Sequence, residues 1–463
     1  MKPISVQQLA QVVQGTVLQG PADVAITGVT IDNRTVHKGD LFVAFIGQRT
    51  DGHQFIPDAF ERGASAALVS SDDFRCDGPN PLIRVENPLA AIQELAKYER
   101  QGFFGPVIGI TGSNGKTTTK EMLRTVFQTE APCLFTPANL NNELGLPLTI
   151  LQRNEDHRAI ILEMGMRGMG QIAALCEIAK PTAGLITNIG HSHIELLGSQ
   201  EAIASAKAEL LDALPETGTL VLNGDDPWLR KVSKRLSGAP LWFCLGEGND
   251  AYATDIRTDG LGTTFVAHLL GEQQEVFIPT YGFHNVQNAL GALLMGRAHR
   301  LNFRKMAYAL KSLTPSSGRL HFVEGSQNRM VIDDCYNASP ASMQASLGVL
   351  KEIAHNRSTV AILGDMYELG DFEEEGHQLV GKYVVEQGID ILIAVGPKSE
   401  WIAKAAQEGG HPKVIYYPSK KSLLGHLHEL PASSVVLVKA SRGMQFEEIV
   451  QYLSGTKDTE TIH

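Results

Sequence analysis

Residues 107–119 read VIGITGSNGKTTT, and this stretch decides how the rest of the chain is expected to fold. Its apolar, β-branched start predicts a buried strand, its glycines predict a tight turn, and residues 117–128 have the pattern of a helix. Gly112 and Gly115 allow the backbone N–H groups of the turn to point inward, around a polyphosphate. The helix that follows adds the positive end of its dipole. The stretch therefore predicts a phosphate loop for ATP.

Side chains of the same stretch supply the chemistry that a phosphate loop needs. Lys116 would place a positive charge on the outer phosphates, and Thr117 or Thr118 would place a hydroxyl on Mg²⁺. Ile110 stands where the general Walker A pattern has its first glycine, so a plain glycine turn with an incidental lysine is the alternative. The strand–turn–helix context favours the ATP site. The predicted ATP contacts of the loop are Gly112, Ser113, Asn114, Gly115, Lys116, Thr117 and Thr118.

The composition limits the class of protein. At 463 residues the chain is too long for one core and predicts two to four domains, with the 43% hydrophobic and 20% charged residues of a globular protein. No apolar run is long enough for a membrane span, and the first residues, MKPISVQQLAQVV, lack the apolar segment of a signal peptide. Five dispersed cysteines favour reduced thiols in a cytoplasm. A net charge of −11 without a basic run gives no support to nucleic-acid binding.

Three segments differ in pattern, and from them we predict an α/β protein of three domains. Residues 1–104 combine a short helix with short strands in a small substrate-binding domain. Residues 105–313 alternate strands with helices, which predicts a central ATPase domain with a mostly parallel sheet. Residues 314–463 contain five strand–helix units of Rossmann type, without the G-x-G-x-x-G fingerprint of a dinucleotide site. The last residues, 454–463, are predicted to be a frayed tail.

Polar residues follow two strands of the predicted central sheet. Glu163 comes at the carboxyl end of the apolar strand 159–162, where open α/β sheets bind their ligands. It is a candidate Mg²⁺ ligand, with a helix-capping or surface carboxylate as the alternative. His191 and His193 follow the next strand and indicate a second divalent site, because histidine is an unusual ligand for Mg²⁺.

Four other polar features stay open between an ordinary structural role and function. The runs 32–34 and 49–53 are typical turn sequences, but Arg34 and nearby amides could also hold a phosphate group of a substrate. Read by itself, Lys207 is a solvated helix lysine. Asn285 is predicted to be the N-cap of the helix that follows it.

Taken in order, these motifs resemble the ATP-dependent Mur ligases of peptidoglycan synthesis, over about residues 25–450. ITGSNGKTTT is similar to that family's phosphate loop, and Glu163-Met-Gly to its Mg²⁺-binding segment. Thr187-Asn188-Ile189 followed by His193 resembles its second metal motif. Lys207 matches a lysine that is carboxylated to a carbamate in the family, so two Mg²⁺ ions are implied. The implied catalytic residues are Lys116, Glu163, His193 and Lys207. The implied metal ligands are Thr117, Glu163, His193 and N6-carboxylated Lys207.

The resemblance also extends to the nucleotide and the substrates. Asn288 matches an asparagine that meets adenine, Arg319 an arginine that reaches the nucleotide, and Asp334 an aspartate on the ribose. NLNNELGLPLT, DDCYNASPASM, LGDMYELG and VKASRG resemble the family member that joins D-alanyl-D-alanine to UDP-N-acetylmuramoyl-tripeptide. We expect these two partners and a monomer, although Asn33 stands where the family often has serine. The implied substrate contacts are Asn33, Arg34, Asp51, Gly52, His53, Asn139, Asn141 and Asn142.

Two rival classes share parts of these patterns. One is another amide ligase of the group, either the enzyme that adds the third peptide residue or a folylpolyglutamate synthase-like ligase. The missing D-N-P-R-type signature and the N-terminal domain weigh against both. The other class is a non-catalytic nucleotide-binding protein, against which the complete set of implied catalytic residues weighs. The sequence leaves open whether the third residue of the tripeptide is meso-diaminopimelate or lysine.

Overall fold

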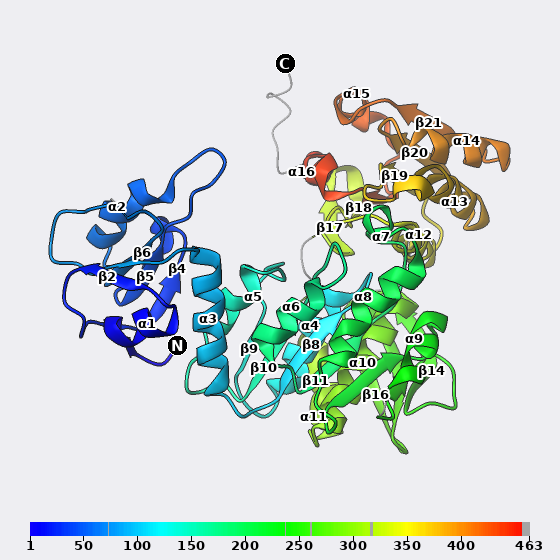
Figure 1. Cartoon of the computed structure of the whole chain (residues 1–463). Helices are drawn as coiled ribbons and strands as arrows, with labels where there is room; N and C mark the ends of the chain where they lie inside the picture. Colours follow the sequence, from blue (N-terminus) through cyan, green and yellow to red (C-terminus); the bar gives the residue numbers. More distant parts are fainter. Residues whose placement is uncertain (73, 237, 260–261, 315–317, 456–463) are drawn as a thin grey trace.

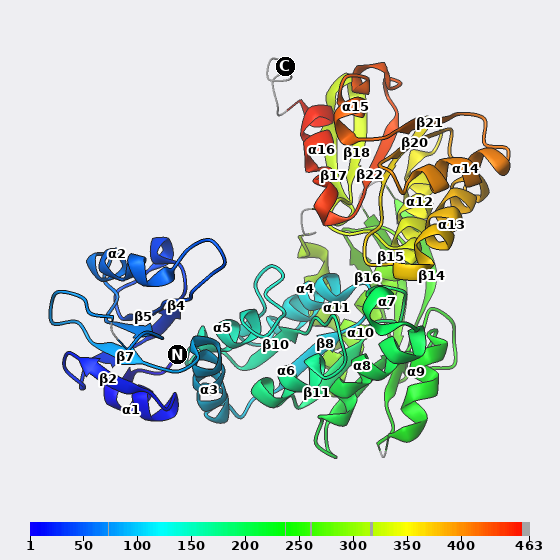
Figure 2. The ribbon, with the colours of Figure 1, turned by 45° about the horizontal axis from the view of Figure 1, so that its top comes forward.

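Three sheets follow one another along the chain, as the sequence predicts (Figures 1 and 2). The computed structural model describes residues 1–72, 74–236, 238–259, 262–314 and 318–455. The predicted α/β class with three domains is confirmed, since each sheet has its own helices and strand order. The domain boundaries at 104/105 and 313/314 stay predictions. Residues 456–463 of the predicted tail lie outside the described residues.

The N-terminal domain has a five-stranded sheet in the order β2-β7-β6-β5-β4, beside a small β1–β3 ladder. Strands β4 to β7 are parallel, and β2 is antiparallel to β7. Successive residues of β5 and β6 point into apolar clusters on opposite faces, so both strands are buried along their length. The strands are β1 (Ile4–Ser5), β2 (Thr16–Gln19), β3 (Ala25–Ile26), β4 (Gly28–Thr30), β5 (Asp40–Val43), β6 (Ala66–Val69) and β7 (Leu82–Arg84); the α-helices are α1 (Val6–Val12), α2 (Ile56–Glu61) and α3 (Pro88–Gln101).

The central domain has a nine-stranded sheet in the order β16-β15-β14-β13-β12-β11-β8-β10-β9. Strands β8 to β13 are parallel to their neighbours in the sheet, and β14 is parallel to β13, which confirms the mostly parallel sheet. Strands β14, β15 and β16 form an antiparallel addition that the sequence analysis did not predict. The strands are β8 (Val107–Thr111), β9 (Cys133–Phe135), β10 (Ala159–Glu163), β11 (Ala183–Ile186), β12 (Thr219–Asn223), β13 (Leu241–Phe243), β14 (Ala251–Asp259), β15 (Gly262–Leu269) and β16 (Glu272–Ile278).

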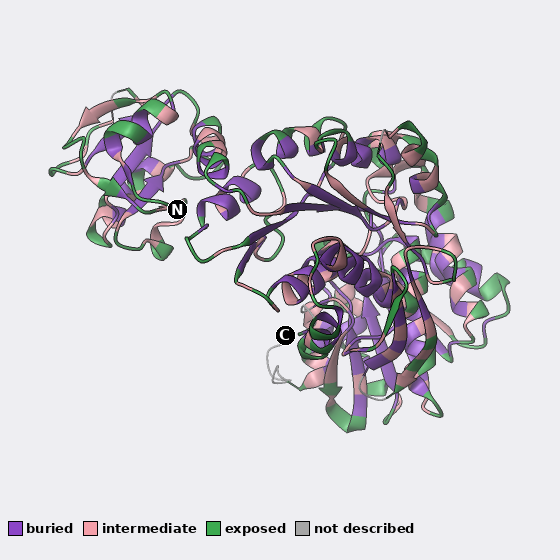
Figure 3. Cartoon of the chain, turned by 90° about the horizontal axis from the view of Figure 1, so that it is seen from below, coloured by how far each residue is buried: buried purple, intermediate pink, exposed green. Residues whose placement is uncertain are grey.

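Helices cover both faces of this sheet, and the strands between them are almost wholly buried (Figure 3). The helix predicted at 117–128 is α4 (Lys116–Phe127). The N-cap predicted at Asn285 is wrong, because α10 begins two residues earlier, and the Asn285 amide donates instead to Thr280 Oγ1 and the Tyr281 carbonyl. The other helices are α5 (Gly145–Leu151), α6 (Gln171–Ala179), α7 (Ile194–Leu197), α8 (Gln200–Asp212), α9 (Pro227–Val232), α10 (Phe283–Ala298) and α11 (Phe303–Ala309).

The C-terminal domain has a six-stranded sheet in the order β17-β18-β22-β19-β20-β21. The five predicted strands are β18 to β22 and are parallel, whereas β17 pairs antiparallel with β18 and was not predicted. The strands are β17 (His321–Gly325), β18 (Arg329–Asp333), β19 (Thr359–Gly364), β20 (Ile391–Val395), β21 (Val414–Tyr417) and β22 (Val435–Lys439); the α-helices are α12 (Pro340–Ala354), α13 (Glu373–Glu386), α14 (Glu400–Glu408), α15 (Lys420–Leu424) and α16 (Glu447–Ser454).

Candidate active site

The predicted phosphate loop lies between β8 and α4, and its two glycines are required by its shape. Gly115 has φ +80°, and a Cβ there would lie 2.7 Å from Asn288 Oδ1. Gly112 has φ +149°, and a Cβ there would lie 1.9 Å from Thr187 Oγ1. A side chain at either position would therefore strain the backbone and push away a neighbouring polar residue. The missing first glycine of the Walker pattern does not prevent the turn.

A second turn, which follows β11, holds the loop in place. Ser113 N–H donates to the Asn188 carbonyl at 2.9 Å, and Asn114 N–H donates to Asn188 Oδ1 at 2.9 Å. Thr187 Oγ1 donates to the Asn114 carbonyl at 2.5 Å. The motif Thr187-Asn188 thus fixes the position of the loop before any nucleotide binds.

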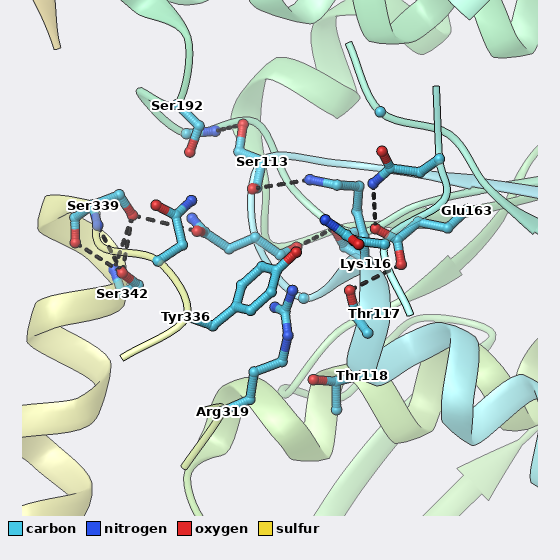
Figure 4. Close-up of a pocket in the computed structure, with 18 of the residues that line it drawn as sticks. Ser113, Lys116, Thr117, Thr118, Glu163, Ser192, Arg319, Tyr336, Ser339 and Ser342 are labelled. Atoms are coloured by element: carbon cyan, nitrogen blue, oxygen red, sulfur yellow. Dashed lines mark hydrogen bonds between the residues drawn. The ribbon is translucent and has the colours of Figure 1, made fainter. Parts of the chain in front are cut away.

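Lys116, the first residue of α4, folds back onto the loop that it follows (Figure 4). Its Nζ donates to the Gly112 carbonyl at 2.7 Å and to the Ser113 carbonyl at 3.3 Å. Burial lowers the pKa of Lys116; the charge of Glu163 opposes this shift, and that of Arg319 adds to it. Among the residues that the structure describes, the acceptors of this ammonium are two neutral carbonyls, so anionic phosphate oxygens would be stronger partners for it.

Glu163 ends β10 and is buried, with 2% of its surface exposed. Thr117 Oγ1 donates to Glu163 Oε2 at 2.9 Å, and Asn141 Nδ2 donates to Glu163 Oε1 at 2.8 Å. Figure 4 shows Thr117, Glu163 and Lys116 side by side. Because the carboxylate is part of this hydrogen-bonded cluster, the alternative of a helix-capping or surface glutamate is wrong.

Lys207 lies in α8 and is 1% exposed, so the solvated helix lysine expected from the sequence alone is wrong. Within the described ranges, its Nζ has neither a hydrogen-bond acceptor nor a carboxylate partner. Burial, and after it the positive charge of Lys116, lower the pKa of Lys207 well below its usual 10.5. The neutral amine therefore forms at a lower pH than in an exposed lysine.

His193 is the residue before α7 and has φ +67°. Its Nδ1 lies 2.7 Å from Glu368 Oε2 of the C-terminal domain, and the two side chains form an ion pair when the imidazole is protonated. Nearby, the His191 ring stacks on Phe372 at 4.5 Å between centroids. The proximity of His193 lowers the pKa of Glu368. This corner of the site is thus closed by side chains from two domains.

The C-terminal domain contributes the residues predicted to contact the nucleotide. Arg319 lies over the Tyr336 ring, 4.0 Å from its centroid, and both point toward the phosphate loop in Figure 4. Asp334 is buried, and its Oδ2 accepts from Lys439 Nζ at 2.5 Å. Close to this pair, burial lowers the pKa of His284 to about 4, so the imidazole is neutral.

These groups line one cavity of about 1230 Å³, which is large enough for a nucleotide with part of a second ligand. Of the residues predicted for the site, the structure brings together Ser113, Asn114, Gly115, Lys116, Thr117, Thr118, Asn139, Asn141, Asn142, Glu163, His193, Lys207, Asn288, Arg319 and Asp334. Gly112 shapes the loop from behind and does not line the cavity.

The five predicted substrate residues of the N-terminal domain lie outside this cavity. Asn33 donates to Asp58 Oδ2 at 2.7 Å, and the exposed Arg34 pairs with Asp32 in the same turn. His53 is 5% exposed, and both of its ring nitrogens are engaged: Nδ1 lies 2.6 Å from Asp51 Oδ1, and Nε2 accepts from the Ser70 amide at 3.2 Å. His53 therefore stabilises its own domain, while the polar ends of Asn33 and Arg34 stay near the surface. Gly52, the remaining residue of the five, also lies outside the cavity.

Two residues that the sequence analysis passed over lie in or beside the site, of which Glu368 lines the cavity and Lys120 does not. Lys120 lies one helical turn after Thr117 in the run KTTTK, and this spacing could have placed it on the same buried face. Glu368 approaches His193 only through the packing of two domains, so no local pattern could have revealed it. The sequence showed the helix face but not the domain contact.

The oxygen donors fit a hard divalent cation at one end of the cavity. Thr117 Oγ1 and Glu163 Oε2 are 2.9 Å apart, and both belong to cavity-lining residues. The described residues contain no group of three or more His, Cys, Asp or Glu arranged to hold a metal by themselves. That pattern is typical of Mg²⁺ sites in which phosphate oxygens and water complete the shell.

No helix in the described ranges combines the length and the apolar character that a membrane crossing requires.

A strand–glycine loop–helix unit, a buried carboxylate on the next strand and an interdomain cavity define a P-loop nucleotide-binding protein. Comparison with known proteins narrows this class. Three family profiles match the chain in order: the Mur ligase family, catalytic domain over 25–100, the Mur ligase middle domain over 110–296, and the Mur ligase, glutamate ligase domain over 318–442. The chain belongs to the Mur ligase family, and as a member it is an ATP-dependent amide ligase.

Full-length relatives and solved structures agree with this assignment. The UDP-N-acetylmuramoyl-tripeptide–D-alanyl-D-alanine ligase of Bacillus subtilis (strain 168) is 37% identical over 97% of this chain and 98% of its own length. A crystal structure of MurF from Acinetobacter baumannii matches with a TM-score of 0.87 and 31% identity, over 98% and 99% of the two chains. MurF ligase from Thermotoga maritima in complex with ADP matches with a TM-score of 0.79 and 29% identity, over 92% and 97%.

Proposed function

We propose that this protein joins D-alanyl-D-alanine to UDP-N-acetylmuramoyl-tripeptide at the expense of ATP, and so makes the pentapeptide precursor of peptidoglycan. The observation that carries the proposal is the single cavity in which the phosphate loop, Glu163, Lys207 and the C-terminal Arg319 meet. The named relatives, which match nearly the whole chain, support the choice of substrates.

The proposed reaction has two chemical steps. The terminal carboxylate of the tripeptide attacks the γ-phosphate of ATP, which gives an acyl phosphate and ADP. The amine of D-alanyl-D-alanine then attacks the acyl carbon, and the C–O bond to phosphate breaks as the amide forms. Two anions must approach each other in the first step, so neutralising charge is the main catalytic task.

We assign most of that task to Lys116 and the backbone of the phosphate loop. Lys116 would exchange its two carbonyl acceptors, those of Gly112 and Ser113, for phosphate oxygens. Arg319 reaches the same space from the C-terminal domain and is close enough to influence the pKa of Lys116. The C-terminal side of the cavity would therefore supply Arg319 as a second cation for the nucleotide, beside Lys116.

We assign one Mg²⁺ ion to Thr117 and Glu163, and a second to His193 and carboxylated Lys207. When bound, these ions would neutralise charge on the transferred phosphoryl group. The fit at Glu163 rests on its buried oxygens beside the Thr117 hydroxyl. The second site needs an anionic oxygen that the described side chains around Lys207 do not supply, and a carbamate would supply it.

Lys207 is well suited to carboxylation. Only a neutral amine attacks CO₂, and burial lowers the pKa of Lys207 in the direction that frees its lone pair. The ammonium first loses one proton to become the neutral amine. The N–C bond to CO₂ then forms as one C=O bond becomes a C–O⁻ single bond and a second proton leaves the nitrogen, so the cation has become an anionic ligand after two protons are lost. The change would also turn the repulsion between Lys207 and Lys116 into attraction.

We propose that the UDP end of the substrate binds the N-terminal domain near Asn33 and Arg34, and that Asn139 and Asn142 meet its peptide. The carboxylate must then reach Lys116 in the central cavity. A monomer in the cytoplasm is the proposed working state.

The test is ADP release with each UDP-N-acetylmuramoyl-tripeptide, with and without D-alanyl-D-alanine. We expect turnover only with both substrates, and the preferred tripeptide will identify the third residue. Turnover with a free amino acid and a dipeptide-bearing nucleotide would instead indicate the ligase that adds the third residue. Nucleotide binding without turnover under any combination would indicate the non-catalytic class.

A further inference from the structure

Lys120 is a completely buried lysine that the proposed reaction does not use. It lies in α4 with 0% of its surface exposed. Its Nζ donates to the Thr136 carbonyl at 2.8 Å and to the Ala138 carbonyl at 3.2 Å, and it lies 3.1 Å from Glu121 Oε1. The ammonium thus has two hydrogen-bond acceptors and an ion-pair partner, and such partners are what a charge inside a protein needs.

The two carbonyls belong to the start of the loop 136–142, which follows β9 and carries the predicted substrate asparagines. Ala138 has φ +46°, a conformation that a residue with a side chain rarely adopts. This turn brings two carbonyl oxygens onto the same ammonium. Lys120 therefore holds the loop at the point where its backbone is most unusual.

The same loop holds Glu163. Thr136 Oγ1 accepts from the Glu163 amide at 3.0 Å, and Asn141 Nδ2 donates to Glu163 Oε1 at 2.8 Å. The Asn141 carbonyl accepts from the Gly165 amide at 2.8 Å. The loop thus accepts from the backbone amides of Glu163 and Gly165, and it donates to one of the two carboxylate oxygens of Glu163.

Thr117 and Lys120 are three residues apart, so they lie on one face of α4. Thr117 bonds Glu163 Oε2 directly, while Lys120 bonds the loop whose Asn141 bonds Glu163 Oε1. We propose that Lys120 is a positioning residue: it fixes the loop 136–142 so that Glu163 presents its carboxylate to Mg²⁺–ATP. This inference rests on the metal role proposed for Glu163.

The test measures how much Mg²⁺ tightens the binding of a non-hydrolysable ATP analogue, by calorimetry with and without the metal. We expect Lys120→Met to keep metal-free binding and to lose about tenfold or more of the Mg²⁺-dependent tightening, as when an outer partner of a metal ligand is removed. ADP release should fall in parallel. Leu123→Ala is the matched control, because Leu123 is also 0% exposed in α4 but belongs to the apolar core.

A coupled pair of variants separates positioning from general stability. Asn141→Ala should lose the same tightening, and the double variant with Lys120→Met should lose little more, because both act through one loop. If Lys120→Met is destabilised but tightens with Mg²⁺ as Leu123→Ala does, the proposal is wrong. If Lys120→Met does not fold, normal tightening in Asn141→Ala overturns it, since the loop would then not act on Glu163.

Glu163→Ala distinguishes this inference from the function on which it rests. Loss of tightening in Glu163→Ala with normal tightening in Lys120→Met refutes the positioning role alone. Normal tightening in Glu163→Ala removes Glu163 from the metal site, and the proposed role of Lys120 falls with it. Loss in both, with Leu123→Ala unaffected, supports the proposal.

Discussion

Replacing Lys207 with methionine should stabilise the protein while it abolishes ligation. Methionine has nearly the length of lysine and fills the same buried space, but it needs no partner for a charge. Lys207 is 1% exposed and has no acceptor among the described residues, and burial lowers its pKa. A buried polar group without a partner costs about 1–3 kcal/mol in protein mutational data, and this is the upper limit for Lys207, because it lines the cavity. In a domain of about 200 residues this corresponds to a rise in Tm of roughly 2–12 °C.

The pH dependence of this difference has a definite sign. The folded pKa of Lys207 lies below the usual 10.5 of the unfolded chain, so the unfolded state binds an extra proton between these two pKa values. The stability of the unmodified protein therefore rises with pH across that window, whereas methionine contributes no such dependence. The advantage of Lys207→Met should accordingly shrink as the pH rises from the folded pKa of Lys207 towards the usual 10.5.

The assay is thermal unfolding in CO₂-depleted buffer, followed by tryptophan fluorescence. Two of the three tryptophans, Trp228 and Trp242, lie in α9 and β13 of the central domain, which contains Lys207. The third, Trp401, lies in α14 of the C-terminal domain, so Trp401→Phe is made in all variants. Bicarbonate with Mg²⁺ should raise the Tm of the unmodified protein, because carboxylation occurs only in the folded state, and should not affect Lys207→Met.

Lys120→Met is the matched comparison, since it removes another fully buried lysine. It leaves two carbonyls without their donor and removes one of the two cations beside Glu121, the other being Arg124, so it should destabilise by about 2–4 kcal/mol. Both substitutions replace lysine with methionine, but the Tm is expected to fall in Lys120→Met and to rise in Lys207→Met. A fall in Tm for Lys207→Met of the size found for Lys120→Met would refute the reasoning, because Lys207 would then have a partner in the folded protein.

Three further predictions concern other parts of the site. Lys116→Ala should lower acyl phosphate formation, measured as ADP release, by about 10²–10³-fold at unchanged Tm, and normal turnover would refute the assigned role. His284 is held neutral with a pKa of about 4, so the protein loses stability as pH falls below 6.5 and the unfolded imidazole takes up a proton. His284→Gln should remove up to about 3 kcal/mol of that loss in acid unfolding titrations, and an identical pH dependence in both proteins would contradict the buried neutral state. His53→Ala should destabilise the N-terminal domain by about 1–3 kcal/mol, seen as an earlier unfolding step, whereas a higher KM for the UDP substrate at unchanged Tm would show direct contact instead.

Local patterns were enough to predict the phosphate loop but not the sheet around it. The glycine spacing placed the helix at 117–128, one residue from the observed α4, because turn geometry and helix start are encoded within a few residues. The antiparallel addition β14–β16 depends on which strands pair, and pairing is decided by contacts between distant segments. The strand β17 was not predicted for the same reason, because it is defined by its antiparallel pairing with β18.

Lys207 shows a signal that was present in the sequence and was misjudged. Ile203, Lys207, Leu210 and Leu211 have the spacing of one helix face, and the other three are apolar and buried. A lysine in that stripe must either be buried or interrupt the packing. The spacing of apolar residues in this helix could therefore have predicted that Lys207 is buried, although only the resemblance suggested what the buried amine does.

The chemistry of the domain contacts explains why the cavity lies where it does. One apolar cluster runs from the N-terminal domain through α3 into the central domain, so these two domains share a core. The C-terminal domain instead meets the phosphate loop through polar contacts, such as Ser339 Oγ with Asn114 Oδ1 at 3.3 Å and His193 with Glu368. Polar contacts can be exchanged for contacts to a charged ligand at little cost, whereas an apolar core cannot. A nucleotide bound at the phosphate loop would therefore replace polar contacts, while the core shared through α3 would keep the N-terminal domain attached to the central domain.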